Sequence, residues 1–241
     1  MNLITISGPP SSGKTSIITK TIESLKSRGI NVGVVKFDCL YTDDDKIYEK
    51  LGVPVKKGLS GSLCPDHYFV SNIEEVVQWG IKKDLDLLIT ESAGLCNRCS
   101  PYIQNIKAIC VIDNLSGINT PKKIGPMLKT ADMVVITKGD IVSQAEREVF
   151  ASKVSSVNPR ALVMHINGLT GQGAYEFSTQ IYDEEMKLKT LVGEKLRFSM
   201  PSALCSYCLG ETRIGEAHQL GNVKKIDLGD RKSTRLNSSH T

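Results

Sequence analysis

"GPPSSGKT", from Gly8 to Thr15, is the stretch that decides the fold of this 241-residue chain. It fits the pattern G-x-x-x-x-G-K-[ST], follows the apolar run "LITIS" (3–7) and opens a helix-like segment at 14–28. Glycines at such a junction let backbone N–H groups wrap phosphates at a helix N-terminus, the arrangement called a P-loop. A glycine-rich turn without a ligand is the weaker alternative. We therefore expect a nucleotide site with Lys14 on the β/γ-phosphates and Thr15 on Mg²⁺. Its contacts should come from Gly8, Ser11, Ser12, Gly13, Lys14, Thr15 and Ser16.

Strand-like runs recur outward from this motif, at 3–7, 32–37, 85–90, 108–113, 133–137 and 161–166. They are nearly continuous aliphatic and β-branched runs, as expected for strands covered on both faces. Helix-like segments at 14–28, 69–83, 121–130 and 143–156 lie between several of them. This alternation predicts an α/β fold with a doubly wound, mostly parallel sheet.

The pattern changes after Tyr182, and we expect three parts. The P-loop domain takes residues 1–182, and a small C-terminal appendage rich in Gly and Cys takes 183–229. The ending "DRKSTRLNSSH" (230–240) corresponds to translated read-through of a common short-read sequencing adapter. We interpret 230–241 as such an artefact rather than a natural basic, Ser-rich tail, and leave it out of the fold.

Composition limits the partners. Hydrophobic residues make up 40% of the chain and charged residues 23%, which is ordinary for a soluble globular protein. Without the one acidic and three basic residues of the ending, 27 basic and 25 acidic residues remain of 30 and 26, a net charge of +2. No apolar run approaches the roughly 20 residues of a membrane span, and the N-terminus lacks the pattern of a signal peptide. We expect a cytoplasmic protein without a nucleic-acid or membrane partner.

A second motif concerns the base of the nucleotide. "VVITKGD" (134–140) is similar to the N-K-x-D base-recognition motif of GTPases, with Thr137 where that motif has Asn. Asp140 would accept hydrogen bonds from guanine N1–H and its exocyclic amine, and the stem of Lys138 would cover the ring. The loop "HINGLTGQG" (165–173) stands where GTPases place their second base-contacting loop. We expect GTP, and the threonine leaves ATP open.

Taken together, the motifs resemble the HypB/UreG class (CobW/HypB/UreG) of P-loop GTPases, which insert nickel into hydrogenase and urease. The resemblance runs from about residue 2 to 182 and includes "FDCLYTDDDKIYEKLGVPV" (37–55), "SLCPDH" (62–67), "ESAG" (91–94), "VNPRA" (157–161) and "LTGQG" (169–173). It implies a SIMIBI-type G domain in which Asp38 is the switch aspartate, Glu91 the Walker-B acid and Gly94 a γ-phosphate sensor. Lys14, Asp38 and Glu91 would then be catalytic, with Thr15, Asp38 and Glu91 holding Mg²⁺. The run at 43–45 is expected instead to cap and open the next helix.

The resemblance also implies a transition-metal site. Cys64-Pro65-Asp66-His67 stands where these proteins have a first Cys-His or Cys-Pro-His, and Cys96 and Cys99 stand where they have a Cys-Pro after the Walker-B strand. Thiolate and imidazole ligands suit Ni²⁺ or Zn²⁺. We expect Cys64, His67, Cys96 and Cys99 as candidate ligands, with Cys99 better supported than Cys96.

A second Cys-x-x-Cys pair, Cys205 and Cys208, lies beyond the resemblance. It suits a zinc site, an Fe–S cluster shared by a dimer, or loop packing, and these alternatives stay open. Cys39 and Cys110 are expected in the core.

The leading functional hypothesis is a dimeric, GTP-hydrolysing metallochaperone with GTP, Mg²⁺ and a transition metal. It would deliver nickel or a zinc-like metal to a client metalloenzyme or its accessory maturation proteins. The alternative is a P-loop Fe–S cluster carrier that uses Cys205 and Cys208 across a homodimer. That alternative is weaker because "GPPSSGKT" lacks the early second lysine typical of such carriers.

Overall fold

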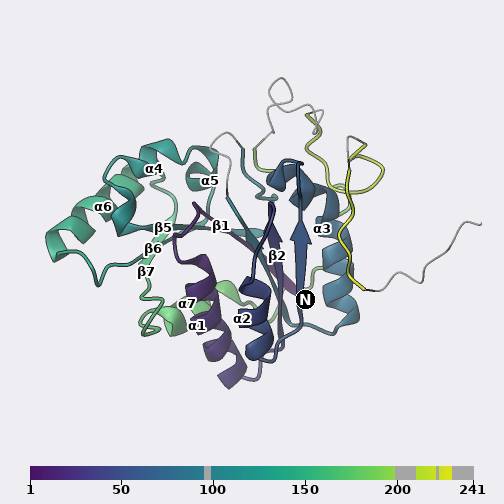
Figure 1. Ribbon diagram of the computed structural model, residues 1–241, viewed down its shortest axis with the longest axis horizontal. Helices are drawn as coiled ribbons and strands as arrows, with labels where there is room; N and C mark the ends of the chain where they lie inside the picture. The colour runs from purple at the N-terminus through teal and green to yellow at the C-terminus, as the bar shows by residue number, and fades with distance from the viewer. Residues whose placement is uncertain (95–98, 199–209, 221–222, 230–241) are drawn as a thin grey trace, which may run out of the picture.

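A seven-stranded parallel sheet forms the centre of the computed structural model, which describes residues 1–94, 99–198, 210–220 and 223–229 (Figure 1). The strand order is β3-β2-β4-β1-β5-β6-β7. The strands are β1 (Asn2–Ser7), β2 (Val32–Asp38), β3 (Val55–Leu59), β4 (Leu87–Ser92), β5 (Lys107–Asp113), β6 (Met133–Thr137) and β7 (Leu162–His165). The predicted doubly wound α/β fold is confirmed, and every pair in the sheet is parallel.

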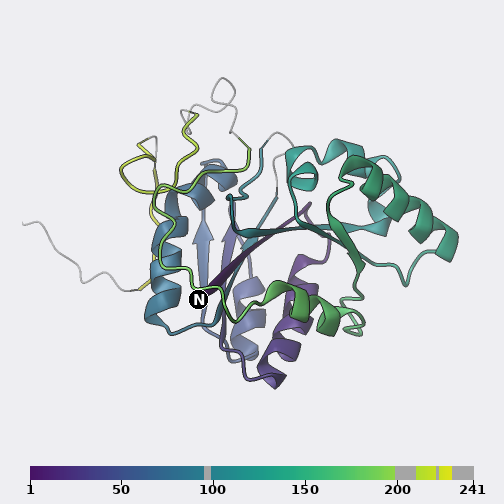
Figure 2. The ribbon, with the colours of Figure 1, turned by 180° about the vertical axis from the view of Figure 1, so that it is seen from behind.

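Helices cover both faces of the sheet, as the two opposite views show (Figures 1 and 2). Side chains of α1 (Lys14–Ser27) and α7 (Ala174–Ile181) share one buried cluster with alternate residues of the central strands, and Tyr48 of α2 (Asp44–Lys50) joins it. The opposite face packs against α3 (Pro65–Lys82) on one side. On its other side lie α4 (Thr120–Lys123), α5 (Pro126–Lys129) and α6 (Gln144–Val157). The central strands are therefore buried on both faces, which explains their continuous apolar sequences.

Several elements differ from the sequence expectation for local reasons. The edge strand β3 was not predicted, because Lys56, Lys57 and Gly58 interrupt its apolar pattern. The helix expected at 121–130 is two short helices, since Gly125 adopts φ 68° and Pro126 starts a new turn. Helix α3 begins at Pro65, four residues before the expected start, and α7 was also not predicted.

The described parts of the C-terminal stretch (183–198, 210–220 and 223–229) pack on the face that carries α3. Leu191, Leu196, Ile214 and Ile226 are buried in the same cluster as α3. Arg197 donates hydrogen bonds to the backbone oxygens of 103, 106 and 130 and to both carboxylate oxygens of Asp132. These residues thus form part of the core of this face, and the division at residue 182 stays a prediction.

Parallel pairing brings the carboxyl ends of all strands to one edge of the sheet. The P-loop follows β1 there, Asp38 ends β2, and Asp113 and Thr137 end β5 and β6. In open α/β sheets, ligands bind at this edge, near the point where the chain reverses direction across the sheet. None of the helices in the described part of the chain is long and apolar enough to cross a membrane.

Candidate functional site

The P-loop leads into a cleft of about 460 Å³ at the carboxyl edge, which we call the phosphate cleft. Gly13 caps α1 with φ 89°, a left-handed conformation that L side chains rarely adopt. A Cβ on Gly8 would lie 2.1 Å from the Val111 carbonyl oxygen, so only glycine fits against β5. Ser11, Gly13, Lys14, Thr15 and Ser16 line the cleft, whereas Ser12 is buried behind it. The predicted loop therefore has the shape of a phosphate cradle.

The Lys14 ammonium group folds back over this loop. It donates to the carbonyl oxygens of Gly8 at 2.9 Å and Pro9 at 2.8 Å. Burial lowers the pKa of Lys14 to about 8, against the opposing attraction of Glu91. Phosphate oxygens would compensate this desolvated cation better than two carbonyls.

Glu91, near the end of β4, is fully buried and is held by three neighbours. Its Oε1 accepts from Lys36 Nζ at 2.6 Å and lies 3.1 Å from Thr15 Oγ1, while its Oε2 accepts from the Tyr48 hydroxyl at 2.6 Å. The Tyr48 pKa is raised well above its usual value, first by burial and then by Glu91, so the phenol stays protonated and donates. The Glu91 carboxylate is thus fixed beside the P-loop threonine.

The structure adds Asp44 to the predicted magnesium residues. It lies in the first turn of α2, as expected, but its Oδ2 is also 2.7 Å from Lys36 Nζ and 3.1 Å from Thr15 Oγ1. Burial would raise its pKa, yet Lys36 outweighs this and leaves the pKa lowered. Asp38, at the end of β2, lines the same cleft. One hydroxyl and three carboxylates suit Mg²⁺, which prefers oxygen ligands.

Of the predicted base-recognition residues, Lys138 and Asp140 line two different clefts, and Thr137 lines neither. Thr137 Oγ1 donates to the Ser12 carbonyl at 2.6 Å, so the threonine ties β6 to the P-loop. Lys138 has φ 56° and lines the phosphate cleft, with its ammonium 3.6 Å from Asp113. The exposed Asp140 instead lines a neighbouring cleft of about 550 Å³ together with Asn167 and Gln172 of the second predicted base loop.

Gly94 brings the segment after β4 against the P-loop. It adopts φ 60°, and a Cβ there would lie 2.2 Å from the Gly8 carbonyl oxygen. The described residues between β4 and β5 (93–94 and 99–106), which we call the linking segment, also contact the end of β1 just before the loop. Tyr102 is fully buried, accepts from Ser7 Oγ at 2.7 Å and donates to the Ile109 carbonyl at 2.9 Å. Ser7 directly precedes Gly8, so the start of the P-loop is held from two sides.

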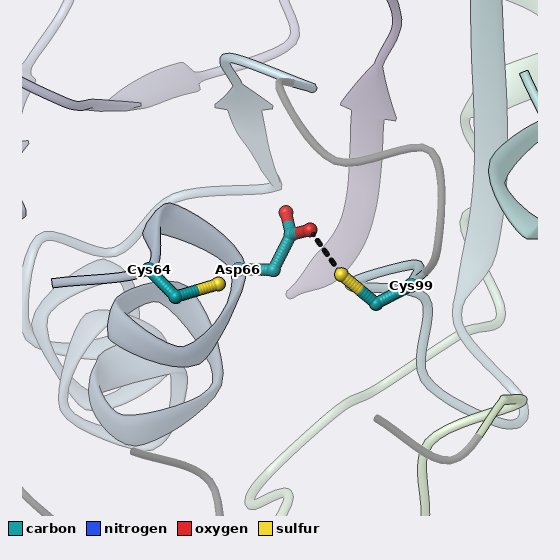
Figure 3. Close-up of side chains that lie close together, drawn as sticks. All are labelled: Cys64, Asp66 and Cys99. Carbon is teal, nitrogen blue, oxygen red and sulfur yellow. Dashed lines mark hydrogen bonds between the residues drawn. The ribbon is translucent and has the colours of Figure 1, made fainter. Parts of the chain in front are cut away.

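The same linking segment carries one member of a candidate metal centre. Ligand atoms of Cys64, Asp66 and Cys99 all lie within 4.8 Å of one another, and we call these residues the three-ligand cluster (Figure 3). Cys64 caps α3 and Asp66 lies in its first turn, while Cys99 comes from the linking segment. The Cys99 thiol donates to Asp66 Oδ2 at 2.9 Å. Two sulfurs on one tetrahedral zinc ion, at about 2.3 Å each, lie about 3.8 Å apart, so these atoms are near ligand spacing.

Asp66 is a ligand candidate that sequence reasoning missed. It is 1% exposed, and its Oδ1 has no hydrogen-bond partner in the described part of the chain. Burial raises its pKa to about 7, with Cys99 opposing this and Cys64 adding to it. A buried carboxyl with an unused oxygen beside two thiols fits a cation better than a structural role.

The remaining cysteine and histidine predictions have different outcomes. His67 does not belong to the three-ligand cluster; it is buried, and neither ring nitrogen has a hydrogen-bond partner among the described residues. Cys96, Cys205 and Cys208 lie outside the described residues. Cys110 is buried in β5, where burial raises its thiol pKa to about 12, and Cys39 is half-buried with its thiol 3.3 Å from the Gly61 carbonyl oxygen.

Comparison with known proteins places this geometry in a family. The model of the CobW/HypB/UreG nucleotide-binding domain matches residues 2–165. The uncharacterized protein MJ0120 of Methanocaldococcus jannaschii is 50% identical over 227 residues, 94% of this chain and 97% of that protein. The urease accessory protein UreG of Yersinia enterocolitica is 33% identical and covers 74% of this chain and 86% of its own length.

Solved structures agree on the fold. HypB from Helicobacter pylori in complex with nickel superposes with a TM-score of 0.60 at 18% identity, over 78% of this chain and 92% of that one. The P-loop, Glu91 and Gly94 all lie within residues 2–165, which the family model matches. The chain therefore belongs to the CobW/HypB/UreG family of P-loop GTPases.

Proposed function

We propose that this protein is a GTP-hydrolysing metallochaperone that couples its nucleotide state to the binding and delivery of a transition metal. The observation that carries the proposal is the linking segment. It contacts the P-loop through Gly94, it contacts Ser7, the residue just before that loop, through Tyr102, and it also supplies Cys99 to the three-ligand cluster.

The nucleotide half rests on the phosphate cleft. Lys14 and the P-loop amides would bind the phosphates, and Thr15, Asp38, Asp44 and Glu91 would hold Mg²⁺. Bound there, Mg²⁺ would neutralise charge on the β- and γ-phosphates. Asp38 or Glu91 would orient the attacking water from its end of a fixed strand. GTP is favoured by the Thr-Lys-Gly-Asp sequence at 137–140, with Asp140 as the guanine acceptor.

The metal half rests on donor chemistry. Two thiols and a carboxylate suit Zn²⁺ or Ni²⁺, and the nickel bound by the H. pylori relative favours nickel as the cargo. The ligands come from two elements that are not continuous in sequence, α3 and the linking segment. A small displacement of the linking segment would therefore separate Cys99 from Cys64 and Asp66 and release the ion.

Coupling follows from this shared segment. A γ-phosphate bound near Gly94 shifts the metal equilibrium only if the two nucleotide states differ in metal affinity. We propose that the GTP and GDP states differ in this way, in a homodimer that serves a client metalloenzyme or its accessory proteins in the cytoplasm. The UreG relatives, named as urease accessory proteins, support a role of this kind.

The decisive experiment titrates Ni²⁺ and Zn²⁺ into the full-length, reduced protein in three states: nucleotide-free, with GDP, and with a non-hydrolysable GTP analogue. The proposal expects one tight site whose affinity changes at least about fivefold between the GDP and analogue states. The matched control is Cys64→Ser with Cys99→Ser, which should lose this site yet still hydrolyse GTP. Equal metal affinity in all three states would refute the coupling, and absence of GTP turnover would refute the enzyme.

A further inference from the structure

Lys36 is an unexpected cation in the middle of the magnesium residues. It lies in β2, in the apolar run "VGVVKF", and only 4% of its surface is exposed. A lysine is almost never buried so deeply unless its charge is compensated. Its place in the sheet explains the compensation, because its register partner in β4 is Glu91.

The Lys36 ammonium group contacts the predicted ion ligands directly. Nζ is 2.6 Å from Glu91 Oε1, 2.7 Å from Asp44 Oδ2 and 3.8 Å from Asp38 Oδ2. The ammonium group is therefore held as a positive charge among three carboxylates.

The shared oxygen atoms are what make this arrangement functional. The hydroxyl of Thr15, the magnesium ligand of the P-loop, lies 3.1 Å from the same two atoms, Asp44 Oδ2 and Glu91 Oε1. Mg²⁺ takes its oxygens at about 2.0–2.1 Å. A Mg²⁺ ion bound to either oxygen atom would lie close to the ammonium group that already contacts the same atom, and like charges at such short range repel strongly.

We propose that Lys36 is a built-in counter-cation for the magnesium carboxylates, and that Mg²⁺ entering with a nucleotide displaces its ammonium group. Without a nucleotide, the cleft should then bind a divalent cation only weakly, since the positive charge of Lys36 would repel it. The phosphates supply the negative charge that reverses this balance. Displacement would also take the ammonium group away from Asp38, whose Oδ2 lies 3.8 Å from it.

This inference rests on the proposed magnesium site, but not on hydrolysis or on a transition metal. Its test therefore uses nucleotide-free protein and Mn²⁺ as the probe, with binding followed by electron paramagnetic resonance. Only Mn²⁺ that excess Mg²⁺ displaces is counted, because Mg²⁺ takes oxygen ligands and leaves thiolate sites alone. Loss of GTP turnover would leave this measurement unaffected, so the two proposals fail separately.

Lys36→Met and Lys36→Gln both remove the charge and should bind Mn²⁺ at least about tenfold more tightly than the unmodified chain. Lys36→Arg keeps the charge and should show no gain. The matched control is Lys57→Met, because Lys57 is the register partner of Lys36 on β3 and pairs with Asp45 at 2.7 Å. This variant should also show no gain in Mn²⁺ affinity.

Thermal unfolding gives a second readout if the neutral variants are too unstable to titrate. Three uncompensated carboxylates destabilise the fold, so Mn²⁺ should raise the unfolding midpoint of Lys36→Met far more than that of Lys57→Met. The proposal is overturned if both neutral variants bind Mn²⁺ no more tightly than the unmodified chain and gain no extra midpoint shift. It is equally overturned if Lys36→Arg gains as much as Lys36→Met, because loss of the positive charge could then not be the cause.

Discussion

Replacing Asp66 with asparagine isolates one protonation event in the three-ligand cluster. The pKa of this carboxyl is about 7 in the folded protein against an ordinary value of 3.8, and the largest cause is burial. The folded chain therefore holds a proton that the unfolded chain releases at lower pH. Since the folded state binds more protons between pH 4 and pH 7, the free energy of unfolding falls as pH rises through that range.

The size of this effect follows from the shift. About three pKa units at 1.36 kcal/mol each give about 4 kcal/mol of stability lost by pH 8, relative to low pH. Asparagine has nearly the same shape and cannot ionise, so Asp66→Asn lacks this loss. Its amide group would be buried without an acceptor, at a cost of about 1–3 kcal/mol. The metal-free variant should thus be more stable than the unmodified chain at pH 8, by about 1–3 kcal/mol, and less stable near pH 4.5.

Urea unfolding from pH 4.5 to 8, with a chelator and a reductant present, measures the pH at which the stability curves of Asp66→Asn and the unmodified chain cross. Asp84→Asn is the matched control, since Asp84 occupies an exposed turn with φ 52°, where asparagine is tolerated. Parallel stability curves for Asp66→Asn and the unmodified chain would refute the reasoning. In a separate Zn²⁺ titration of the folded, reduced protein without chelator, Asp66→Asn should bind the metal at least about tenfold more weakly than the unmodified chain, because it has lost an anionic ligand.

Three further changes test other contacts. Tyr102→Phe removes the hydroxyl that accepts from Ser7, and it should lower the free energy of unfolding in urea by about 1–3 kcal/mol. It should also reduce the difference in metal affinity between the nucleotide states. An unchanged difference would show that Tyr102 takes no part in the coupling. Thr137→Val removes the donor to the Ser12 carbonyl and should weaken nucleotide binding about tenfold, as measured by calorimetry. Thr137→Ser keeps the hydroxyl and should retain the affinity. Equal nucleotide affinities for the two variants would contradict a role of this hydrogen bond in nucleotide binding. Lys14 lines the phosphate cleft, and burial lowers its pKa to about 8, so at pH 8 a small acylating reagent that enters the cleft should find a larger neutral fraction of this amine than of exposed lysines. Mg²⁺ with GTP should protect Lys14 from acylation, and mass spectrometry that finds no protection would exclude phosphate contact by this lysine.

The sequence by itself determined the features that depend on consecutive residues. The P-loop was predictable because its glycines, lysine and threonine act within eight positions, and the backbone geometry of such a turn is local. The strands around it were predictable because burial on both faces leaves continuous apolar runs. Glu91 and Asp38 lie at the ends of such runs, and the resemblance to a known family implied their roles. Even the departures at β3 and at Gly125-Pro126 have local causes, namely edge lysines and a helix-breaking pair.

Only the tertiary structure decided which side chains meet. Lys36 interrupts an apolar run, but its sequence does not show that Glu91 is its register partner, since strand order sets that pairing. The choice of Asp66 over His67 depends on where α3 begins. Successive residues of an α-helix point about 100° apart, so the start at Pro65 fixes which one faces Cys99. Contacts between distant segments are set by packing, and a sequence pattern records only that each residue is buried.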